Sequence, residues 1–326
     1  MNKAKNTGLF ILLIIQAALI VYLYRPGQNA PPPATALFSD LQPGKVTSFT
    51  ITEQTGKTIT LTKVKQAWTV GSSSYPGDND KINHMLKRIA DLKSSRLVSR
   101  TKGSHSRLKV GEELFNRKIA LSGPDGQKAI TFFLGTSPGA KTVYLRRAGD
   151  VDVYEVSGLS TWQLQADNNS WWQEKYVEVN PADLQSLTFT GPDKITLQRD
   201  PKGNWQLADA PADRKLDTKR VEELLNTVSD ISVSGYEDKD FKPHGKPMAT
   251  LTYKTKDKDF SLQIWPTDKK AGEQIVKNSQ ARFYAKLEPY ILKDALSLKK
   301  SALLIKTPPA AQQAAKKNSG ISDKTK

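Results

Sequence analysis

The segment KINHMLKRIADL, residues 81–92, has the pattern of one amphipathic helix. Its large apolar residues recur at the spacing of a single helix face. They are Ile82, Met85, Leu86, Ile89 and Leu92. Asp78 or Asp80 stands where a side-chain oxygen can cap the first turn. The opposite face is basic, with Lys81, Lys87, Arg88 and Lys93. The pattern predicts a helix that covers a sheet with its apolar face.

A second segment, RVEELLNTVSDI at residues 220–231, repeats this pattern. Each apolar residue stands 139 positions after its counterpart, as Val221 does after Ile82, and Asp217 takes the place of Asp78. The matching set is Val221, Leu224, Leu225, Val228 and Ile231. Matched helix positions at a constant offset predict an internal duplication into two lobes.

Short segments of alternating apolar and polar residues precede both helices, and a period of two is typical of strands with one buried face. They are Val46–Ile51, Thr58–Thr62 and Trp68 with Val70 in the first half, and Leu187–Thr190, Lys194–Gln198 and Trp205 with Leu207 in the second. The predicted fold class is therefore α+β: two tandem repeats, residues 37–160 and 181–300, each an antiparallel sheet with one main helix.

Residues 161–180 join the predicted repeats and contain Trp162, Trp171 and Trp172. Clustered indole rings at a junction could form a platform for a ligand. We favour the interpretation that they pack the two repeats together, because large aromatic side chains dominate buried contacts.

The amino-terminal segment Gly8–Tyr24, GLFILLIIQAALIVYLY, carries no formal charge. As a helix it would be roughly 25 Å long, near the lower limit for crossing a bilayer core. Lys3 and Lys5 precede it, which favours a cytoplasmic amino terminus and an extracytoplasmic bulk. We predict a cytoplasmic tip and a single transmembrane anchor at residues 1–25, which place the protein in the membrane that bounds the cytoplasm.

Residues 26–36 have the Pro- and Ala-rich composition of an extended spacer. The alternative is a cleaved secretory signal, because Ala34-Thr35-Ala36 has the A-x-A form. We favour an uncleaved anchor, since the apolar run is longer than most signal cores and the triplet lies well beyond it.

The net charge of +16 is concentrated in residues 81–118 and 299–326. Residues 301–326 are predicted to be a basic, disordered tail. A polar loop at residues 96–109 forms a candidate anion-binding site with the side chains of Arg96, Arg100, Lys102, Arg107 and Lys109. Anionic lipid headgroups or envelope polymers suit an exported domain better than nucleic acid, for which no recognition motif is present. The other interpretation is a solvated surface.

Catalytic and metal-binding patterns give no candidate constellation. The chain has no cysteine and three histidines, His84, His105 and His244, each isolated in sequence. S-x-x-K occurs at Ser106–Lys109 and Ser297–Lys300 without companion motifs, as expected from chance. We predict no enzymatic activity, cofactor or metal.

Several of these motifs together resemble a bacterial family, the proteins with the domain of unknown function 4340. They are Trp68-Thr-Val70, Trp205-Gln-Leu207, the Asp-led helices, Leu134-Gly135 and Val153-Tyr154. The resemblance covers roughly Leu37 to Leu298 as two copies, and the second departs from it with Trp265-Pro266 in place of Leu-Gly.

The resemblance implies a membrane-anchored envelope protein, a companion of ABC-type export systems related to gliding-motility transporters. On that basis we expect a non-catalytic accessory or scaffold subunit, whose anchor packs beside integral membrane transporter subunits. The alternative is a binding module for an anionic envelope polymer or lipid surface, acting through residues 96–109.

Overall fold

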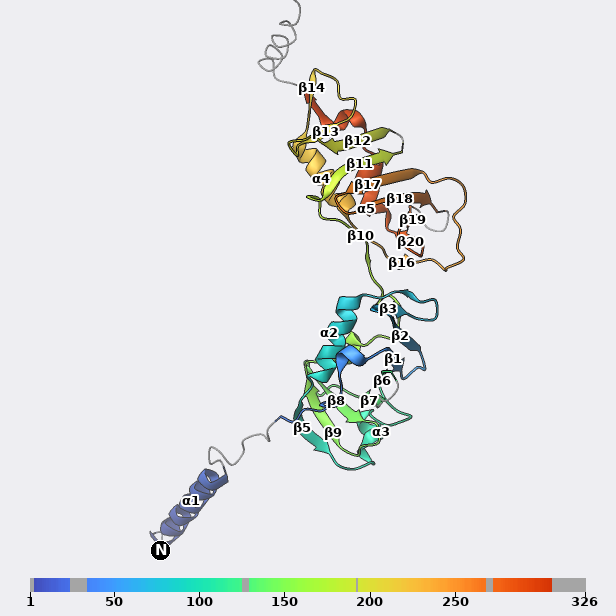
Figure 1. Ribbon diagram of the computed structural model, residues 1–326. Helices are drawn as coiled ribbons and strands as arrows, with labels where there is room; N and C mark the ends of the chain where they lie inside the picture. The colour runs from blue at the N-terminus through green and yellow to red at the C-terminus, as the bar shows by residue number, and fades with distance from the viewer. Residues whose placement is uncertain (1–2, 24–33, 125–128, 192, 268–271, 307–326) are drawn as a thin grey trace, which may run out of the picture. The chain divides into compact units, whose positions relative to one another are not determined.

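The computed structural model describes residues 3–23, 34–124, 129–191, 193–267 and 272–306 (Figure 1). The chain divides into two compact units, residues 1–60 with 83–166 and residues 61–82 with 167–326. Its strands are mostly antiparallel and its helices few, which confirms the predicted α+β class.

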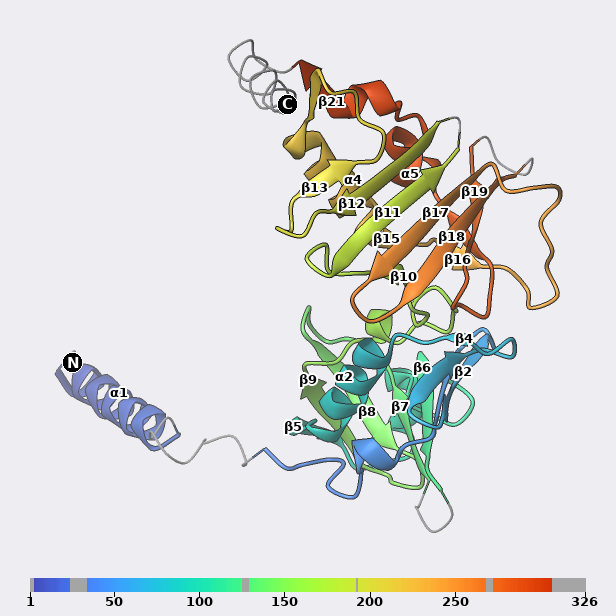
Figure 2. The same ribbon diagram turned by 45° about the horizontal axis from the view of Figure 1, so that its top comes forward.

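A nine-stranded sheet, called the first sheet, has the order β4-β3-β2-β1-β6-β7-β8-β9-β5. Alternate side chains of β1 and β2 are buried, as the period of two predicts. Helix α2 lies against this sheet (Figure 2). The strands are β1 (Ser48–Glu53), β2 (Thr58–Val64), β3 (Ala67–Val70), β4 (Tyr75–Pro76), β5 (Ser94–Ser99), β6 (Arg117–Ser122), β7 (Ile130–Leu134), β8 (Thr142–Arg147) and β9 (Val153–Ser157).

An eight-stranded sheet, the second sheet, has the order β13-β12-β11-β17-β18-β19-β20-β16. Two pairs of strands, β10 with β15 and β14 with β21, form separate small sheets. The strands are β10 (Lys175–Glu178), β11 (Leu184–Thr190), β12 (Lys194–Arg199), β13 (Trp205–Leu207), β14 (Arg214–Leu216), β15 (Asp230–Ser232), β16 (Gly235–Tyr236), β17 (Ala249–Thr255), β18 (Asp259–Pro266), β19 (Gln274–Asn278), β20 (Ala285–Leu287) and β21 (Leu304–Lys306).

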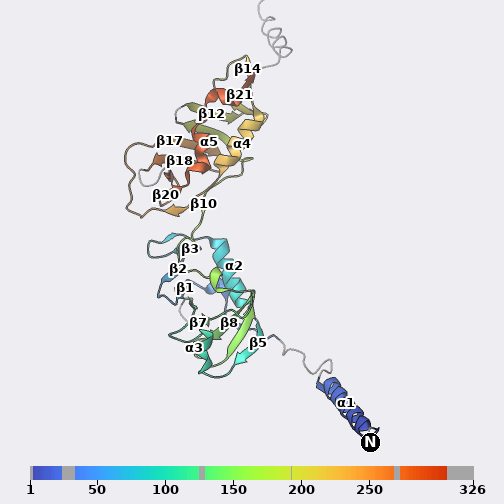
Figure 3. The same cartoon turned by 180° about the vertical axis from the view of Figure 1, so that it is seen from behind.

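The two predicted amphipathic helices are α2 (Asn79–Ala90) and α4 (Thr218–Ser229). The carboxylate of Asp78 accepts a hydrogen bond from the backbone N–H of Lys81 at 2.9 Å, and Asp217 accepts one from Arg220 at 3.2 Å. Each aspartate therefore caps its helix as the sequence predicts. A further helix, α5 (Pro289–Leu296), was not predicted and packs beside α4 (Figure 3). Short 3-10 helices occur at Pro43–Lys45, Thr161–Gln163 and Lys300–Leu303.

The apolar amino-terminal segment forms α1 (Lys3–Leu23). Its described large apolar side chains, such as Ile14 and Leu19, are more than half exposed. Among the residues that the structure describes, no helix combines the length and the apolar character needed to cross a membrane. The membrane-spanning part of the prediction thus gains no support here, and most of the predicted spacer, residues 26–33, lies outside the described residues.

Two sequence predictions need correction. Residues 96–109 are not one polar loop, because they contain most of β5 and a short helix, α3 (Ser104–Leu108). The predicted disordered tail begins too early: Leu303 is fully buried, and β21 pairs with β14. Apolar residues close to the end of the chain hold this segment to the fold, and residues 307–326 lie outside the described part.

Candidate functional site

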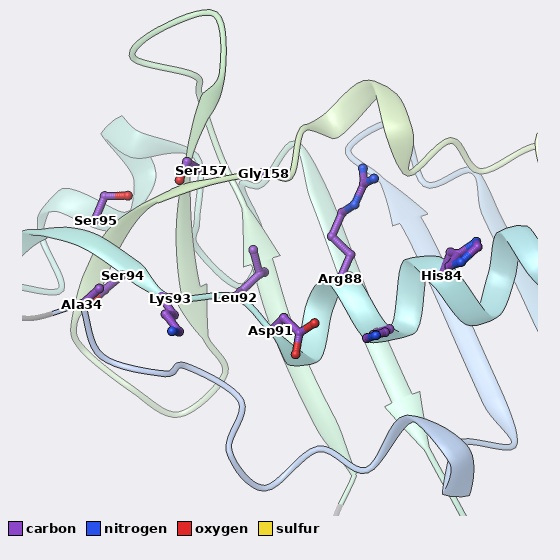
Figure 4. Close-up of a pocket in the computed structure, with 11 residues that line it drawn as sticks. Ala34, His84, Arg88, Asp91, Leu92, Lys93, Ser94, Ser95, Ser157 and Gly158 are labelled. Atoms are coloured by element: carbon purple, nitrogen blue, oxygen red, sulfur yellow. The ribbon is translucent and has the colours of Figure 1, made fainter.

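A groove of about 500 Å³ lies at the carboxyl end of α2 (Figure 4). The helix contributes His84, Lys87 and Arg88, and the turn that follows contributes Asp91, Leu92 and Lys93. The other lining residues come from the start of β5, from the end of β9 and from the segment before the first sheet. They are Ser94, Ser95, Ser157, Gly158 and Ala34. We call this set the α2 groove.

The local sequence explains why the α2 groove is polar. Ile89 is fully buried and Leu92 nearly so, which holds the last turn of α2 against the sheet. The backbone N–H of Asp91 donates to the carbonyl of Lys87 at 3.0 Å, and that of Leu92 donates to Ile89 at 3.2 Å. With the apolar face fixed, Lys87 and Arg88 project into solvent from the opposite face.

The charge of the α2 groove is positive. Lys87, Arg88 and Lys93 are exposed, and none of them forms an ion pair with any described residue. Asp91 is the one acidic residue of the lining. Three cations against one carboxylate leave a net positive charge, which favours phosphate or carboxylate groups as ligands.

One wall of the α2 groove is fixed by backbone hydrogen bonds. The N–H of Ser94 donates to the carbonyl of Thr35 at 2.9 Å, and the N–H of Thr35 donates to the hydroxyl of Ser94 at 3.2 Å. The N–H of Leu37 donates to the carbonyl of Leu92 at 3.0 Å, and Ala36 forms a β-bridge with Lys93. These bonds attach the chain that leads from α1 to the edge of the groove.

The structure does not gather the predicted basic residues into this groove. Arg96 forms an ion pair with Glu155 at 2.9 Å, and Lys109 ends α3 with a φ of 55°. Arg100, Lys102 and Arg107 are exposed, and none of the predicted set lines the α2 groove. Their role in anion binding stays a prediction.

The predicted tryptophan cluster is divided. Trp162 is 70% exposed, whereas Trp171 is fully buried. Trp172 is half-buried, and its ring meets those of Tyr75 and Tyr236 edge-on at 6.2 and 5.6 Å. Trp171, Trp172 and these partners belong to the compact unit formed by residues 61–82 and 167–326. Packing between the two repeats stays a prediction.

Sequence reasoning placed Lys87, Arg88 and Lys93 on the exposed face of the helix but did not select them as a site. The sequence feature that could have indicated them is the excess of Lys and Arg over Asp and Glu that begins at residue 81. What the sequence could not show is that β5, β9 and the segment at Thr35 close a groove around them. No group of three or more His, Cys, Asp or Glu side chains that could hold a metal occurs in the described part of the chain.

The described residues form an α+β protein with mostly antiparallel sheets. The family model for the domain of unknown function DUF4340 matches residues 68–248, which is more than half of the chain. The protein belongs to the DUF4340 family. The match begins at Trp68 and ends at Met248, so it covers part of each predicted repeat. No curated protein and no solved structure matches the chain.

Proposed function

We propose that this protein is a membrane-anchored, non-catalytic scaffold subunit of an envelope transport system, in a bacterial inner membrane with its bulk outside the cytoplasm. Helix α1 would pack beside the membrane helices of ABC-type transporter subunits. The two sheets, products of an internal duplication, would form the extracytoplasmic part. The observation that carries the proposal is the apolar segment Gly8–Tyr24, joined to a large polar α+β fold.

The strand orders support the duplication. Reading outward from β3 and from β13, both sheets follow the same sequence of elements, with β1 matching β11 and β6 matching β17. A cross-strand cation–aromatic pair recurs in register. Lys63 pairs with Trp68 at 5.9 Å from the ring centre, and Arg199 pairs with Trp205 at 4.6 Å. Such agreement in order and register is what two copies of one ancestral domain would retain.

The hydrogen bonds at Thr35 support an uncleaved anchor over a cleaved signal. Cleavage after Ala34-Thr35-Ala36 would remove both Thr35–Ser94 hydrogen bonds and the bridge from Ala36 to Lys93. The fold therefore uses residues that a signal peptidase would discard. Retaining them keeps α1 attached to the first sheet.

Gentle solubilisation of membranes and purification of the full chain test the proposal. We expect a transmembrane transporter subunit and its ATP-binding partner to copurify. The variant Ile14→Arg with Ile15→Arg is the control, because a charged residue at the centre of a spanning helix costs about 3 kcal/mol each. It should lose the partners. Recovery of the same partners by this variant, or turnover of a substrate by the isolated chain, would contradict the proposal.

The second candidate function is binding of an anionic polymer or lipid surface. The α2 groove favours this type of ligand, because it presents three cations without ion-pair partners among the described residues. The residues to neutralise are thus Lys87, Arg88 and Lys93 in addition to the predicted set at 96–109. Loss of salt-sensitive polymer binding in only one of the two variants would show which surface acts.

A further inference from the structure

We propose that the α2 groove docks the first sheet onto phosphate-bearing lipid headgroups of the same bilayer that holds α1. This inference rests on the anchor of the proposed function and adds to it a second, electrostatic membrane contact. The residues that carry it are Lys87, Arg88 and Lys93, with the hydroxyls of Ser95 and Ser157 beside them.

The first argument is the reach of the chain. From Leu23, the last residue of α1, to Ala34 in the groove lining is eleven residue steps. A polypeptide spans at most about 3.6 Å per residue, so this connection can separate the two by no more than about 40 Å whatever its conformation. The backbone bonds at Thr35 hold the far end of the connection at the groove itself. The groove therefore stays within about 40 Å of the end of α1, close enough for the chain to bring it to a bilayer around that helix.

The second argument is effective concentration. A single weak headgroup contact would not retain a free protein on a membrane. For a tethered one the same contact is intramolecular, so even a weak contact acts at a high effective concentration. Each Lys or Arg near an anionic surface contributes about a fivefold preference for the surface, so three give roughly 100-fold. Asp91 offsets part of this preference.

The third argument is the chemistry of the groove. Arg88 projects from α2, the helix that also carries His84, while Lys93 directly precedes β5 and Ser95 lies in it (Figure 4). A fork of guanidinium donors and two ammonium groups suits a phosphodiester, and serine hydroxyls can donate to its oxygens. A cavity of about 500 Å³ accepts a headgroup. The tether keeps the groove close to a bilayer, which favours a lipid headgroup over a soluble polymer.

The test uses the full chain with Ala36→Cys, an exposed position that borders the groove without lining it. It is a unique labelling site because the sequence contains no cysteine. The protein, carrying a fluorophore at this position, is reconstituted into vesicles that contain a headgroup-attached quencher. One set of vesicles is phosphatidylcholine alone, and the other includes phosphatidylglycerol. We expect stronger quenching with phosphatidylglycerol, and we expect added salt to remove the difference because screening weakens exposed ionic contacts.

Two triple variants complete the design. Lys87→Ala, Arg88→Ala and Lys93→Ala together should shift the ratio of docked to undocked protein by roughly 100-fold and abolish the extra quenching. The matched control removes three exposed cations that lie outside both the groove and residues 96–109, Lys45→Ala, Lys57→Ala and Lys141→Ala, and should quench like the parent. Equal quenching in both kinds of vesicle, or an effect of the control as large as that of the groove variant, would overturn the proposal.

Further measurements separate the competing outcomes. If a soluble anionic polymer changes the label's fluorescence and phosphatidylglycerol does not, the groove binds a polymer and membrane docking is wrong. Alkaline extraction of the chain from the vesicles would instead show that the anchor fails.

If the groove variant does not fold, Asp91→Asn replaces it. Removing the one carboxylate should increase docking up to about fivefold, and no increase would overturn the proposal.

Discussion

The two sheets share one strand order but differ where β7 and β18 end. In the first sheet Leu134 is followed by Gly135, and in the second Trp265 is followed by Pro266. A Cβ atom on Gly135 would lie 2.0 Å from the carbonyl oxygen of Leu108 and 3.0 Å from that of Lys109. The carboxyl end of α3 thus approaches the backbone so closely that only glycine fits.

The second sheet lacks this approach. Residues 237–248, which connect β16 to β17, are all described and contain no helix or strand. Trp265 fills space there instead: its indole N–H donates to the carbonyl of Gly245 at 3.3 Å, and its ring meets that of Tyr284 edge-on at 5.7 Å. An added helix therefore determines which residue ends the strand. The glycine of the Leu-Gly motif is therefore required by the packing of α3 against the end of the strand.

A second contrast concerns the matched tryptophans. Trp68 is 1% exposed, whereas Trp205 is half-buried and lines a groove of about 530 Å³. Beside Trp68, β4 pairs with β3, and the N–H of Gly77 donates to the carbonyl of Trp68 at 2.8 Å. In the second sheet β14 pairs with β21 and leaves β13 at the edge. The same register position is covered in one sheet and open in the other.

The largest expected effect comes from the covered tryptophan. Trp68→Ala should reduce the free energy of unfolding by about 3–5 kcal/mol, because it removes a fully buried ring and leaves a cavity. Trp205→Ala should cost clearly less, since that ring already contacts solvent. Chemical denaturation followed by circular dichroism measures both. Equal losses of unfolding free energy in the two variants would contradict the difference in burial between the two tryptophan rings.

Gly135→Ala should reduce the free energy of unfolding by about 1–3 kcal/mol, because the new methyl group meets backbone that cannot rotate away. Gly103→Ala is the control beside α3, since a Cβ there would have no heavy atom within 4 Å. Thermal unfolding compares the two variants. A neutral Gly135→Ala would contradict the account of the Leu-Gly motif.

At alkaline pH we expect a smaller effect, a difference in stability between the two compact units. Burial raises the pKa of Tyr176 to about 12, and burial raises the pKa of Tyr236 and Tyr253 as well. All three lie in the unit formed by residues 61–82 and 167–326. A tyrosine with a raised folded-state pKa stabilises the fold fully below its unfolded pKa of about 10, and this stability is lost as pH rises through the folded value.

Hydrogen exchange measured across this pH range should therefore show the unit that contains Tyr176 opening first. Among the described residues of the other unit, Tyr154 is the one tyrosine whose pKa is raised, through burial that leaves part of its side chain accessible. In Tyr176→Phe, the stability of this unit should fall less between neutral and alkaline pH than in the parent, because one ionisable group is gone. Simultaneous opening of both units would contradict this difference.

The sequence predicted what depends on local spacing. The caps at Asp78 and Asp217, both amphipathic helices and the strands β1–β3 and β11–β13 follow from local spacing within a few residues. The misses depend on distant partners. Residues 96–99 of β5 appeared to be loop because the segment is polar and basic, but they pair with β9. Likewise, β21 pairs with β14, a partner far away in the sequence.

The candidate site was predictable only in part. Its cations lie on a helix face that the sequence identifies, but the groove requires residues that are far apart in the chain. Thr35 and Ser94 are hydrogen-bonded across fifty-nine positions, and Ser157 reaches the same place from β9. A local sequence pattern does not predict contacts between residues that are so far apart in the chain.

The orientation and attachment of the chain test the central claim most directly. Intact spheroplasts producing the full-length Ser95→Cys variant are treated with a membrane-impermeant maleimide, and the membranes are then extracted at alkaline pH. The account predicts labelling without lysis and an uncleaved chain that stays in the membrane fraction. A chain released in soluble form, shortened at its amino terminus, or labelled only after lysis would contradict it.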